Sequence, residues 1–442
     1  MEWLASRRHA LLADEMGLGK SAQAIVAADR IAAERILVVC PAVARVNWMR
    51  EFEKFSTRAL SISVLTAPPS RAPITGRGAG TWICSYDYAT AHVQSLNADL
   101  LILDEAHYLK NPSAKRTHAV LGHIAHTAEC TWALTGTPAP NNAAELWPLL
   151  YTCGLTPLSH AAFITRYCVQ VWNGERLQIV GNQNVEELRA LLTPFMIRRT
   201  KAEVMPDLPP IHFTTFVVEP GDVCLENYFA DRDAVKELHL VRQELAVQAA
   251  MLEGIAKMTD GVSSRRLGAL EGLVTSTATL RRYMGAQKVE PLADLVISEI
   301  DAGAYNKLVI FAMHRVVIEE LRLRLRKFNP VTLYGGTPPT TRQANIDRFQ
   351  KDPKCKIFIG QVQAAGTAIN LTAAHHVLFA EYDWVPATNA QAAMRCHRIG
   401  QTQPVFVRFA VAAGAIDEIV LKVVRRKTKE LAAIFDPVDI FA

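Results

Sequence analysis

The chain has 442 residues, of which 50% are hydrophobic and 21% are charged, and its formal net charge at pH 7 is +5. This length allows two or three domains with sizeable cores, and the composition excludes a disordered or fibrous chain. No apolar run is long enough to span a bilayer and no signal peptide follows Met1, so we expect an intracellular protein that does not enter membranes.

A glycine-rich stretch at residues 11–21 precedes an alanine-rich segment, 22–34, that is predicted to be helical. Such a loop directs several backbone N–H groups at one point beside the positive end of a helix, where phosphates bind. Lys20 would reach the outer phosphates of a nucleotide and Ser21 would hold Mg²⁺. The general pattern has glycine where this chain has Asp14, so the stretch alone favours a nucleotide site no more than an ordinary turn. The candidate nucleotide-binding residues of this loop are Gly17, Gly19, Lys20 and Ser21.

The first half of the chain alternates short apolar runs with longer helical or polar stretches. Continuous apolar runs are typical of strands that are buried on both faces of a parallel sheet, which requires helical crossovers. We therefore predict a parallel α/β lobe over residues 1–210, with ligands at the carboxyl ends of its strands. The predicted strands are 36–40, 82–85, 100–104 and 131–135.

The strand predicted at 100–104 ends in the sequence Asp-Glu-Ala-His. Hydrolysis of a phosphoanhydride needs one carboxylate to hold Mg²⁺ and a second group to orient or deprotonate the attacking water. Asp104 suits the first role and Glu105 suits the second. A bare Asp-Glu pair would more often cap a strand-to-helix turn, but the full motif downstream of Gly-Lys-Ser favours catalysis.

Small hydroxyl residues surround a glycine directly at the end of the strand predicted at 131–135. These residues, Thr135, Gly136 and Thr137, could sense the γ-phosphate and pass its loss on as a backbone shift. We group them with His107 as candidate coupling residues. Taken alone, the segment is also compatible with an ordinary turn at the end of a strand.

The predicted elements change from about residue 217 onward. Residues 222–286 contain no convincing strand, and their apolar residues recur at three- and four-residue steps, so we predict a mainly helical insertion over 211–290. Residues 291–442 are predicted to form a second parallel-sheet lobe that ends in a helix at 416–435. The strands predicted for this lobe are 308–312, 331–334, 356–360, 377–380 and 405–410.

Charge and cysteine patterns add little that is specific. The eight cysteines are dispersed without metal-ligand spacing, so a zinc site or a disulfide framework is not expected. The slightly basic balance favours an anionic partner. Each basic cluster is more consistent with an ordinary charged surface than with a nucleic-acid contact. These clusters are 198–201, 281–282, 322–327 and 425–429.

Taken together and in this order, the motifs resemble those of the Swi/Snf-type DNA-dependent ATPases of helicase superfamily two, above all the annealing-helicase subfamily related to HepA. The resemblance covers nearly the whole chain. Its most specific parts are Asp-Glu-Ala-His, Leu-Lys-Asn at 109–111 and His-Arg-Ile-Gly-Gln at 397–401, because general RNA helicases with the first motif end their last motif differently. The segments that carry the resemblance are 13–21, 38–55, 101–111, 134–150, 198–210, 280–292, 308–314, 364–374 and 391–401.

The resemblance implies two RecA-like lobes with ATP and Mg²⁺ between them. Arg395 and Arg398 are three residues apart and so expected on one helical face, from which they would reach the γ-phosphate as arginine fingers. Gln391 would lie at the lobe interface beside the nucleotide. The family also has a glutamine and an aromatic-rich helix before the phosphate loop; this sequence begins at Met1, inside that helix, so we expect a shortened first lobe.

Double-stranded DNA is the partner that the resemblance implies. Gly366 and Thr367 would offer N–H and hydroxyl groups to one DNA strand, and Trp384 matches a tryptophan of the family, although a packing role for it is at least equally consistent. Contacts of this kind go to phosphate and sugar, so we expect little sequence preference and steep salt dependence.

These patterns predict an ATP- and Mg²⁺-dependent translocase on double-stranded DNA that lacks conventional strand-separating activity. We expect a monomeric motor protein that works in the cytoplasm. A bacterial or viral origin is expected because no chromatin reader, zinc module or nuclease signature is recognisable. Three alternatives stay open: an RNA helicase, a nucleic-acid clamp that has lost catalysis, and the motor subunit of a restriction or defence system.

Overall fold

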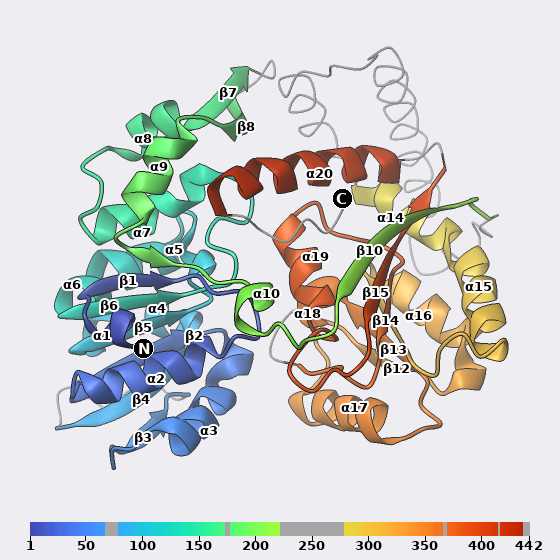
Figure 1. Ribbon diagram of the computed structural model, residues 1–442, viewed down its shortest axis with the longest axis horizontal. Coiled ribbons are helices and arrows are strands. Elements are labelled where there is room, and N and C mark those ends of the chain that lie inside the picture. Colours follow the sequence, from blue (N-terminus) through green and yellow to red (C-terminus); the bar gives the residue numbers. More distant parts are fainter. Residues whose placement is uncertain (67–77, 173–176, 222–277, 366–368, 414–415, 436–442) are drawn as a thin grey trace. The chain divides into compact units, whose positions relative to one another are not determined.

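Two compact units make up the described part of the chain in the computed structural model (Figure 1). The first unit contains Met1–Val169, Asn182–Pro206 and Ala433–Phe435, and the second contains Gln170–Gly181 and Asp207–Ala432. Each unit is built on one parallel sheet. The structure describes residues 1–66, 78–172, 177–221, 278–365, 369–413 and 416–435.

The first unit is organised around a seven-stranded sheet in the order β3-β4-β2-β5-β6-β1-β9, and all its strand pairs are parallel. The central strands are almost entirely buried, as expected for continuous apolar runs with helices on both sides. Its strands are β1 (His9–Leu12), β2 (Arg35–Cys40), β3 (Ile62–Val64), β4 (Gly80–Ser85), β5 (Leu100–Asp104), β6 (Cys130–Leu134) and β9 (Met196–Ile197).

Helices cover both faces of this sheet. Apolar side chains of the first three helices pack with one face of β1, β2, β5 and β6 in a single core, whereas α4 contacts β2 and β4. A π-helical segment, Val120–Ile124, joins α5 to α6. The helices are α1 (Glu2–Ala5), α2 (Lys20–Arg30), α3 (Arg45–Phe55), α4 (Tyr86–Ala91), α5 (Lys115–Ala119), α6 (Ala125–Thr127), α7 (Trp147–Thr152), α8 (His160–Tyr167), α9 (Val185–Leu192) and α10 (Lys201–Val204). Short 3-10 helices lie at Ala42–Ala44, Val93–Ser95, Ala106–Leu109 and Ala143–Leu146.

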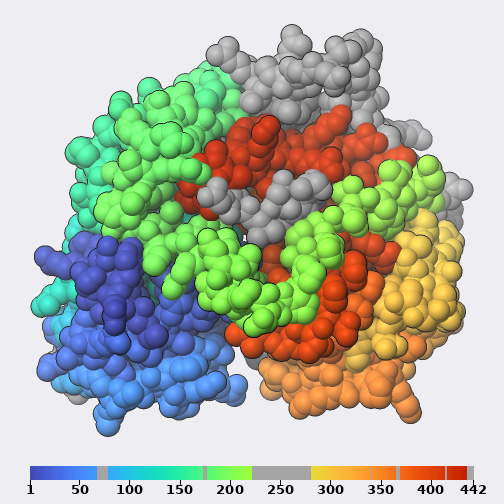
Figure 2. All heavy atoms as spheres, viewed as in Figure 1, coloured from blue at the N-terminus to red at the C-terminus, as the bar shows by residue number. Residues whose placement is uncertain are grey.

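The second unit contains a six-stranded parallel sheet in the order β10-β15-β14-β11-β13-β12. Its edge strand β10 exposes four of its eight residues, and Figure 2 shows its light-green atoms at the surface of the protein. The strands are β10 (Ile211–Val218), β11 (Leu308–Ala312), β12 (Val331–Leu333), β13 (Ile357–Gln361), β14 (His376–Phe379) and β15 (Val405–Ala412). A separate two-stranded sheet pairs β7 (Cys168–Trp172) with β8 (Leu177–Asn182).

Helices also cover both faces of the second sheet. One apolar core lies between the sheet and α15 with α16, and the other contains residues of α14, α17, α19 and α20. The helices are α14 (Ala278–Gln287), α15 (Val289–Asp301), α16 (Arg315–Arg324), α17 (Pro339–Lys351), α18 (Val362–Ala365), α19 (Pro386–Ala393) and α20 (Ile416–Phe435), with a 3-10 helix at Arg326–Phe328. No helix in these described ranges is long and apolar enough to cross a membrane.

The structure confirms the prediction of two parallel-sheet lobes. Each strand predicted from an apolar run is present, and the closing helix α20 has the predicted bounds. Strands β1, β3, β7, β8, β9 and β10, in contrast, were not predicted, and β10 lies where the helical insertion was expected to begin. Most of the helical insertion expected over 211–290 lies outside the described residues, because these exclude 222–277.

Candidate active site

The loop after β1 adopts a conformation that requires glycine at two positions. Gly17 and Gly19 have φ values of +92° and +72°. A Cβ atom at Gly19 would meet nothing within 4 Å, so backbone conformation and not crowding favours glycine there. Gly19 is also the N-cap of α2, which places the loop at the positive end of that helix. Ser21 lies half-buried in the first turn of the helix.

The ammonium group of Lys20 lies over this loop. It donates hydrogen bonds to the carbonyl oxygens of Asp14, at 2.8 Å, and Glu15, at 3.3 Å. Burial lowers the pKa of Lys20, while the carboxylates of Glu105 and Asp104 oppose that shift. Lys20, which is predicted to bind the phosphates, therefore interacts electrostatically with Asp104 and Glu105, the two predicted catalytic carboxylates.

The register of three neighbouring strands brings these groups together. In the order β5-β6-β1, Leu134 of β6 pairs with Asp104 on one side and with Leu12 on the other. The loops that follow the three strands therefore leave the same edge of the sheet, as predicted. At Gly136 a Cβ atom would lie 2.7 Å from Cγ of Met16 and 3.5 Å from Nζ of Lys20, so the loop after β6 closely approaches the loop after β1.

Asp104 is held by hydrogen bonds to its side chain and to its main chain. Its Oδ2 accepts a bond from the indole Nε1 of Trp48 at 2.8 Å, and its Oδ1 accepts one from the Glu105 N–H at 3.0 Å. The hydroxyl of Tyr86 donates to the main-chain oxygen of Asp104 at 2.8 Å. Burial, followed by the neighbouring Glu105 carboxylate, raises the pKa of Asp104 to about 6.

Glu105 lies between Asp104 and the predicted coupling residues. Its backbone is left-handed, with φ +50° and ψ +51°, a conformation that costs a non-glycine residue energy and is often found at functional sites. Its Oε2 lies 3.3 Å from Nδ1 of His107, and the same nitrogen lies 3.0 Å from Oγ1 of Thr135 and 3.3 Å from Oγ1 of Thr137. All four candidate coupling residues are thus close together, with Gly136 between the two threonines.

Asp14 has a structural partner that the sequence did not reveal. Its carboxylate is fully buried and accepts hydrogen bonds from Nε and Nη2 of Arg199. Gln23 joins the pair, because its Nε2 donates to Asp14 Oδ2 at 3.1 Å and its Oε1 accepts from Arg199 at 2.6 Å. The residue that replaces glycine in the general pattern therefore ties the phosphate loop to the segment after β9.

The remaining residues of this segment also hold the loop, and we call residues 198–201 the β9 clamp. Arg198 donates to the carbonyl oxygens of Ala13, at 2.9 Å, and Gly136, at 3.3 Å. The Lys201 N–H donates to Glu15 Oε2 at 2.7 Å, and the Lys201 side chain is buried. The expectation that 198–201 is an ordinary charged surface is wrong, because its cations satisfy main-chain carbonyls and buried carboxylates of the phosphate loop.

Arg395 and Arg398, both in the second unit, lie beyond the end of α19. The prediction that they share a helical face is wrong, because the helix ends at Ala393 and the chain continues in turns up to Gly400, whose φ is +98°. Nη1 of Arg398 donates to the carbonyl oxygen of Ile369 at 3.0 Å. Gln391 lies in the last turn of α19 and is half-buried.

The candidate DNA-binding residues of the second unit are only partly described. Gly366 and Thr367 lie outside the described residues. Trp384 packs against the core that contains α14 and α20, and the Arg281 guanidinium lies 4.4 Å from the centre of its ring. Arg281 also donates to the main-chain oxygen of Tyr382 at 2.7 Å. These contacts give Trp384 a packing role, and its contact with DNA stays a prediction.

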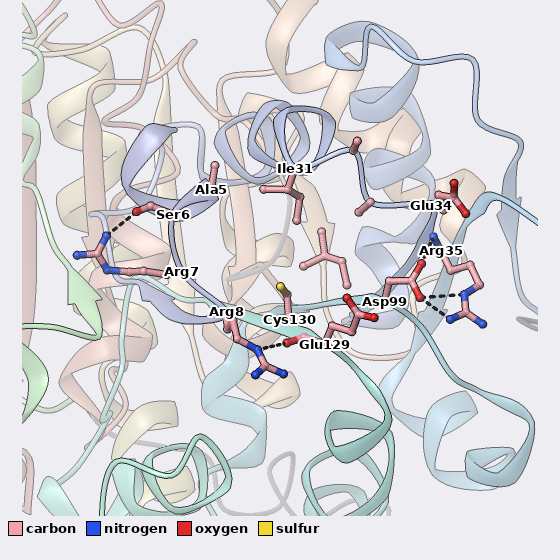
Figure 3. A pocket seen from close by; sticks show the side chains of 13 residues that line it. Ala5, Ser6, Arg7, Arg8, Ile31, Glu34, Arg35, Asp99, Glu129 and Cys130 are labelled. Carbon is pink, nitrogen blue, oxygen red and sulfur yellow. Dashed lines mark hydrogen bonds and ion pairs between the residues drawn. The ribbon is translucent and has the colours of Figure 1, made fainter.

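A pocket of about 670 Å³ lies at the opposite edge of the first sheet, among residues that precede or begin β1, β2, β5 and β6 (Figure 3). Figure 3 shows two of its arginines bonded to their neighbours: Arg35 pairs with Asp99, and Arg8 donates to the main-chain oxygen of Glu129 at 3.1 Å. This pocket is therefore distinct from the site at the carboxyl ends of the strands.

Comparison with known proteins gives matches along most of the chain. Residues 1–265 match the SNF2-related domain, and residues 287–400 match the helicase conserved C-terminal domain. The SWI/SNF-related matrix-associated actin-dependent regulator of chromatin subfamily A-like protein 1 of Drosophila melanogaster is 29% identical over 438 residues, which cover 98% of this chain and 54% of that protein. The DNA annealing helicase and endonuclease ZRANB3 of Mus musculus is 29% identical over 443 residues, covering 95% of this chain and 38% of that protein.

The Sulfolobus solfataricus SWI2/SNF2 ATPase core in complex with dsDNA aligns with 98% of this chain and 95% of its own, at 23% identity and a TM-score of 0.43. The Drosophila melanogaster and Mus musculus relatives are longer proteins, and the chain spans about half or less of their length.

Proposed function

Because the chain belongs to the family of proteins with an SNF2-related domain, we propose that it is an ATP-dependent motor that moves along double-stranded DNA. That membership confirms the family resemblance predicted from the motifs. One observation carries the proposal furthest: the loops after β1, β5 and β6 converge, so that Lys20, two acidic residues and a histidine-threonine network share one site.

The residues of this site fit a nucleotide with its Mg²⁺. Asp104 and Ser21 would hold the ion, and carboxylate and hydroxyl oxygens are ligands that Mg²⁺ accepts. Burial and the neighbouring Glu105 carboxylate raise the pKa of Asp104, and a cation bound beside it would favour the ionised form. When bound, Mg²⁺ would neutralise charge that develops on the phosphate oxygens.

The side chains of the first unit then divide the work. Lys20 would exchange its hydrogen bonds to loop carbonyls for bonds to the outer phosphates, since an ammonium group has three donors and no fixed orientation. Glu105 would orient or deprotonate the attacking water. His107 lies against both Glu105 and the two threonines, so loss of the γ-phosphate could be transmitted to the loop after β6.

The second unit would complete the reaction. We propose that Arg395 and Arg398 stabilise the γ-phosphate as arginine fingers, with Gln391 beside the nucleotide. Such a finger is worth roughly 10³ to 10⁵ in rate in related phosphoryl-transfer enzymes. Hydrolysis would therefore require the two units to close on the nucleotide, and the alternation of closed and open states would drive movement along DNA.

Double-stranded DNA is the proposed track. The name of one relative, a DNA annealing helicase, supports a DNA substrate, and the proposed contacts through Gly366, Thr367 and Trp384 would go to the sugar-phosphate backbone. Binding through backbone phosphates releases counterions, so affinity should fall steeply with salt and depend little on sequence.

Phosphate release measured with and without DNA tests the proposal. We expect strong stimulation of ATP hydrolysis by duplex DNA and less by single-stranded RNA. Lys20→Ala, Glu105→Gln and Arg398→Ala should each abolish turnover while DNA binding stays largely intact. The matched control Glu53→Gln removes an exposed carboxylate on α3 and should retain turnover. Equal rates with and without duplex DNA would refute the proposal, and stronger stimulation by RNA would favour an RNA helicase.

A further inference from the structure

We infer that Trp48 is a positioning residue that holds the Asp104 carboxylate in the orientation needed for Mg²⁺. This inference rests on the proposed function, because it concerns the ion that accompanies ATP. Its basis is the hydrogen bond of 2.8 Å from the indole Nε1 to Oδ2 of Asp104. Trp48 would act on the ion through Asp104.

Trp48 follows β2 in the chain, but its indole lies at the end of the neighbouring strand β5. Cys40 ends β2, which pairs with β5 in a register that places Val39 opposite Leu103. The chain then turns through a short 3-10 helix into α3, whose first turns carry Trp48. The ring is fully buried in the core beside Phe52, one helical turn further on, with ring centres 6.0 Å apart. The indole therefore has little freedom to leave Asp104.

The two hydrogen bonds to the carboxylate fix its plane while leaving capacity for a cation. Oδ1 accepts from the Glu105 N–H and Oδ2 accepts from Trp48, so each oxygen carries one donor. A carboxylate has about four lone-pair positions, and two therefore remain for Mg²⁺ or for water bound to it. Without the indole, only the bond from Glu105 would define the orientation of the side chain.

A neutral donor is the appropriate chemistry for this task. An arginine or lysine in place of Trp48 would also bind the carboxylate, but its charge would compete with a divalent cation. The indole N–H is a donor only, and it does not change its charge with pH. Trp48 can therefore orient the Mg²⁺ ligand without neutralising it.

Tyr86 holds the main chain of Asp104, whereas Trp48 holds its side chain, so the two contributions can be tested separately. Its hydroxyl donates to the Asp104 carbonyl oxygen at 2.8 Å, and its ring stacks on Tyr108 with ring centres 5.4 Å apart. Tyr86 thus fixes the end of β5, whereas Trp48 fixes the side chain. A change at Trp48 should consequently alter metal binding while the backbone of the site stays in place.

The experiment compares Trp48→Phe with Trp132→Phe in the full chain. Both tryptophans are fully buried in the same core, and Trp132 donates its Nε1 hydrogen bond to the Arg7 carbonyl oxygen at 3.0 Å, away from the site. Binding of a fluorescent ATP analogue is titrated against Mg²⁺ and repeated in EDTA. Partners that orient a metal ligand typically contribute about 10- to 100-fold in metal affinity. We expect Trp48→Phe to raise the Mg²⁺ concentration for half-maximal binding by that factor and to leave binding in EDTA unchanged.

The control separates positioning from packing. Trp132→Phe should lower thermal stability by a similar amount and leave the Mg²⁺ dependence at the wild-type value. Equal shifts in both variants, or an unchanged Mg²⁺ dependence in Trp48→Phe, would overturn the inference. If Trp48→Phe does not fold, Trp48 is replaced by benzothienylalanine, in which sulfur takes the place of the N–H without changing the ring shape, and the same outcomes apply. A wild-type protein without Mg²⁺-dependent ATP binding would instead count against the proposed function.

Discussion

Removal of the Arg199 guanidinium should destabilise the first unit strongly. In Arg199→Met the Asp14 carboxylate, whose side chain is 1% exposed, loses both bonds from Arg199 and keeps only the one from Gln23. Breaking a buried ion pair from one side typically costs 3–5 kcal/mol. Because Arg199 is itself 38% exposed, the lower value applies, and we expect about 3 kcal/mol, or a factor of about 150 in the unfolding equilibrium.

Urea unfolding followed by tryptophan fluorescence measures this loss. Five of the seven tryptophans, at positions 3, 48, 82, 132 and 147, lie in the first unit, so the signal reports mainly on its unfolding. The control is Arg166→Met, which breaks an exposed pair with Glu187 of similar geometry, with both bonds at 2.6 Å. Its side chains are 52% and 44% exposed, and a loss of at most about 1 kcal/mol is expected.

A double-mutant cycle identifies the cause of the loss. Asp14→Asn removes the charge that Arg199 compensates, so the double variant with Arg199→Met should be less destabilised than the two single losses together, by about 1–3 kcal/mol. If the losses are additive, or if Arg199→Met costs no more than Arg166→Met, the buried pair does not stabilise the loop and the argument is refuted.

Two further predictions follow from close contacts and charge. Gly136→Ala should destabilise the first unit by about 1–3 kcal/mol and weaken ATP binding, because the new Cβ would lie 2.7 Å from Met16 Cγ. Urea unfolding and nucleotide titration measure the two effects. An unchanged ATP affinity would contradict this prediction. Burial of Glu299 raises the pKa of its carboxyl group, but hydrogen bonds from Arg408 and Tyr305 outweigh burial and lower this pKa. The ionised Glu299 therefore stabilises the fold at neutral pH, and this stabilisation is lost as the pH falls through the lowered folded-state pKa. Glu299→Gln should thus be less stable than wild type by about 2 kcal/mol at pH 7, with the difference shrinking as the pH falls into the acid range, and a difference that stays constant with falling pH would refute this reasoning.

The sequence predicted the parts of the fold that depend on long apolar runs. Strands such as Leu100–Asp104 are apolar on both faces, and this pattern persists whatever the neighbouring strands are. Strand β1 is short and merges with the glycine-rich stretch, whereas β10 lies at a sheet edge and has no continuous buried run. Neither pattern could be separated from loop or helical sequence without knowledge of the pairing.

The site was predictable where a chemical role demands a residue type. Lys20, Asp104, Glu105 and the residues after β6 follow strand ends, and the parallel sheet brings such ends together. Trp48 and Arg199 were missed because their partners are distant in the chain: Asp104 is 56 residues from Trp48, and Asp14 is 185 residues from Arg199. The signal that could have indicated Arg199 is Asp14 itself, since a carboxylate in place of a loop glycine needs a cation when it is buried.

The position of β1 between β6 and β9 also affects how the protein is made. Strand β1 is an interior strand of the finished sheet, and one of its two neighbours, β9, follows it in the chain by about 180 residues. At roughly 5–20 residues per second, synthesis of this interval takes roughly 10–40 s, during which Asp14 and Glu15 have no cationic partner from residues 198–201. The nascent first unit should therefore need protection by chaperones until the clamp has emerged.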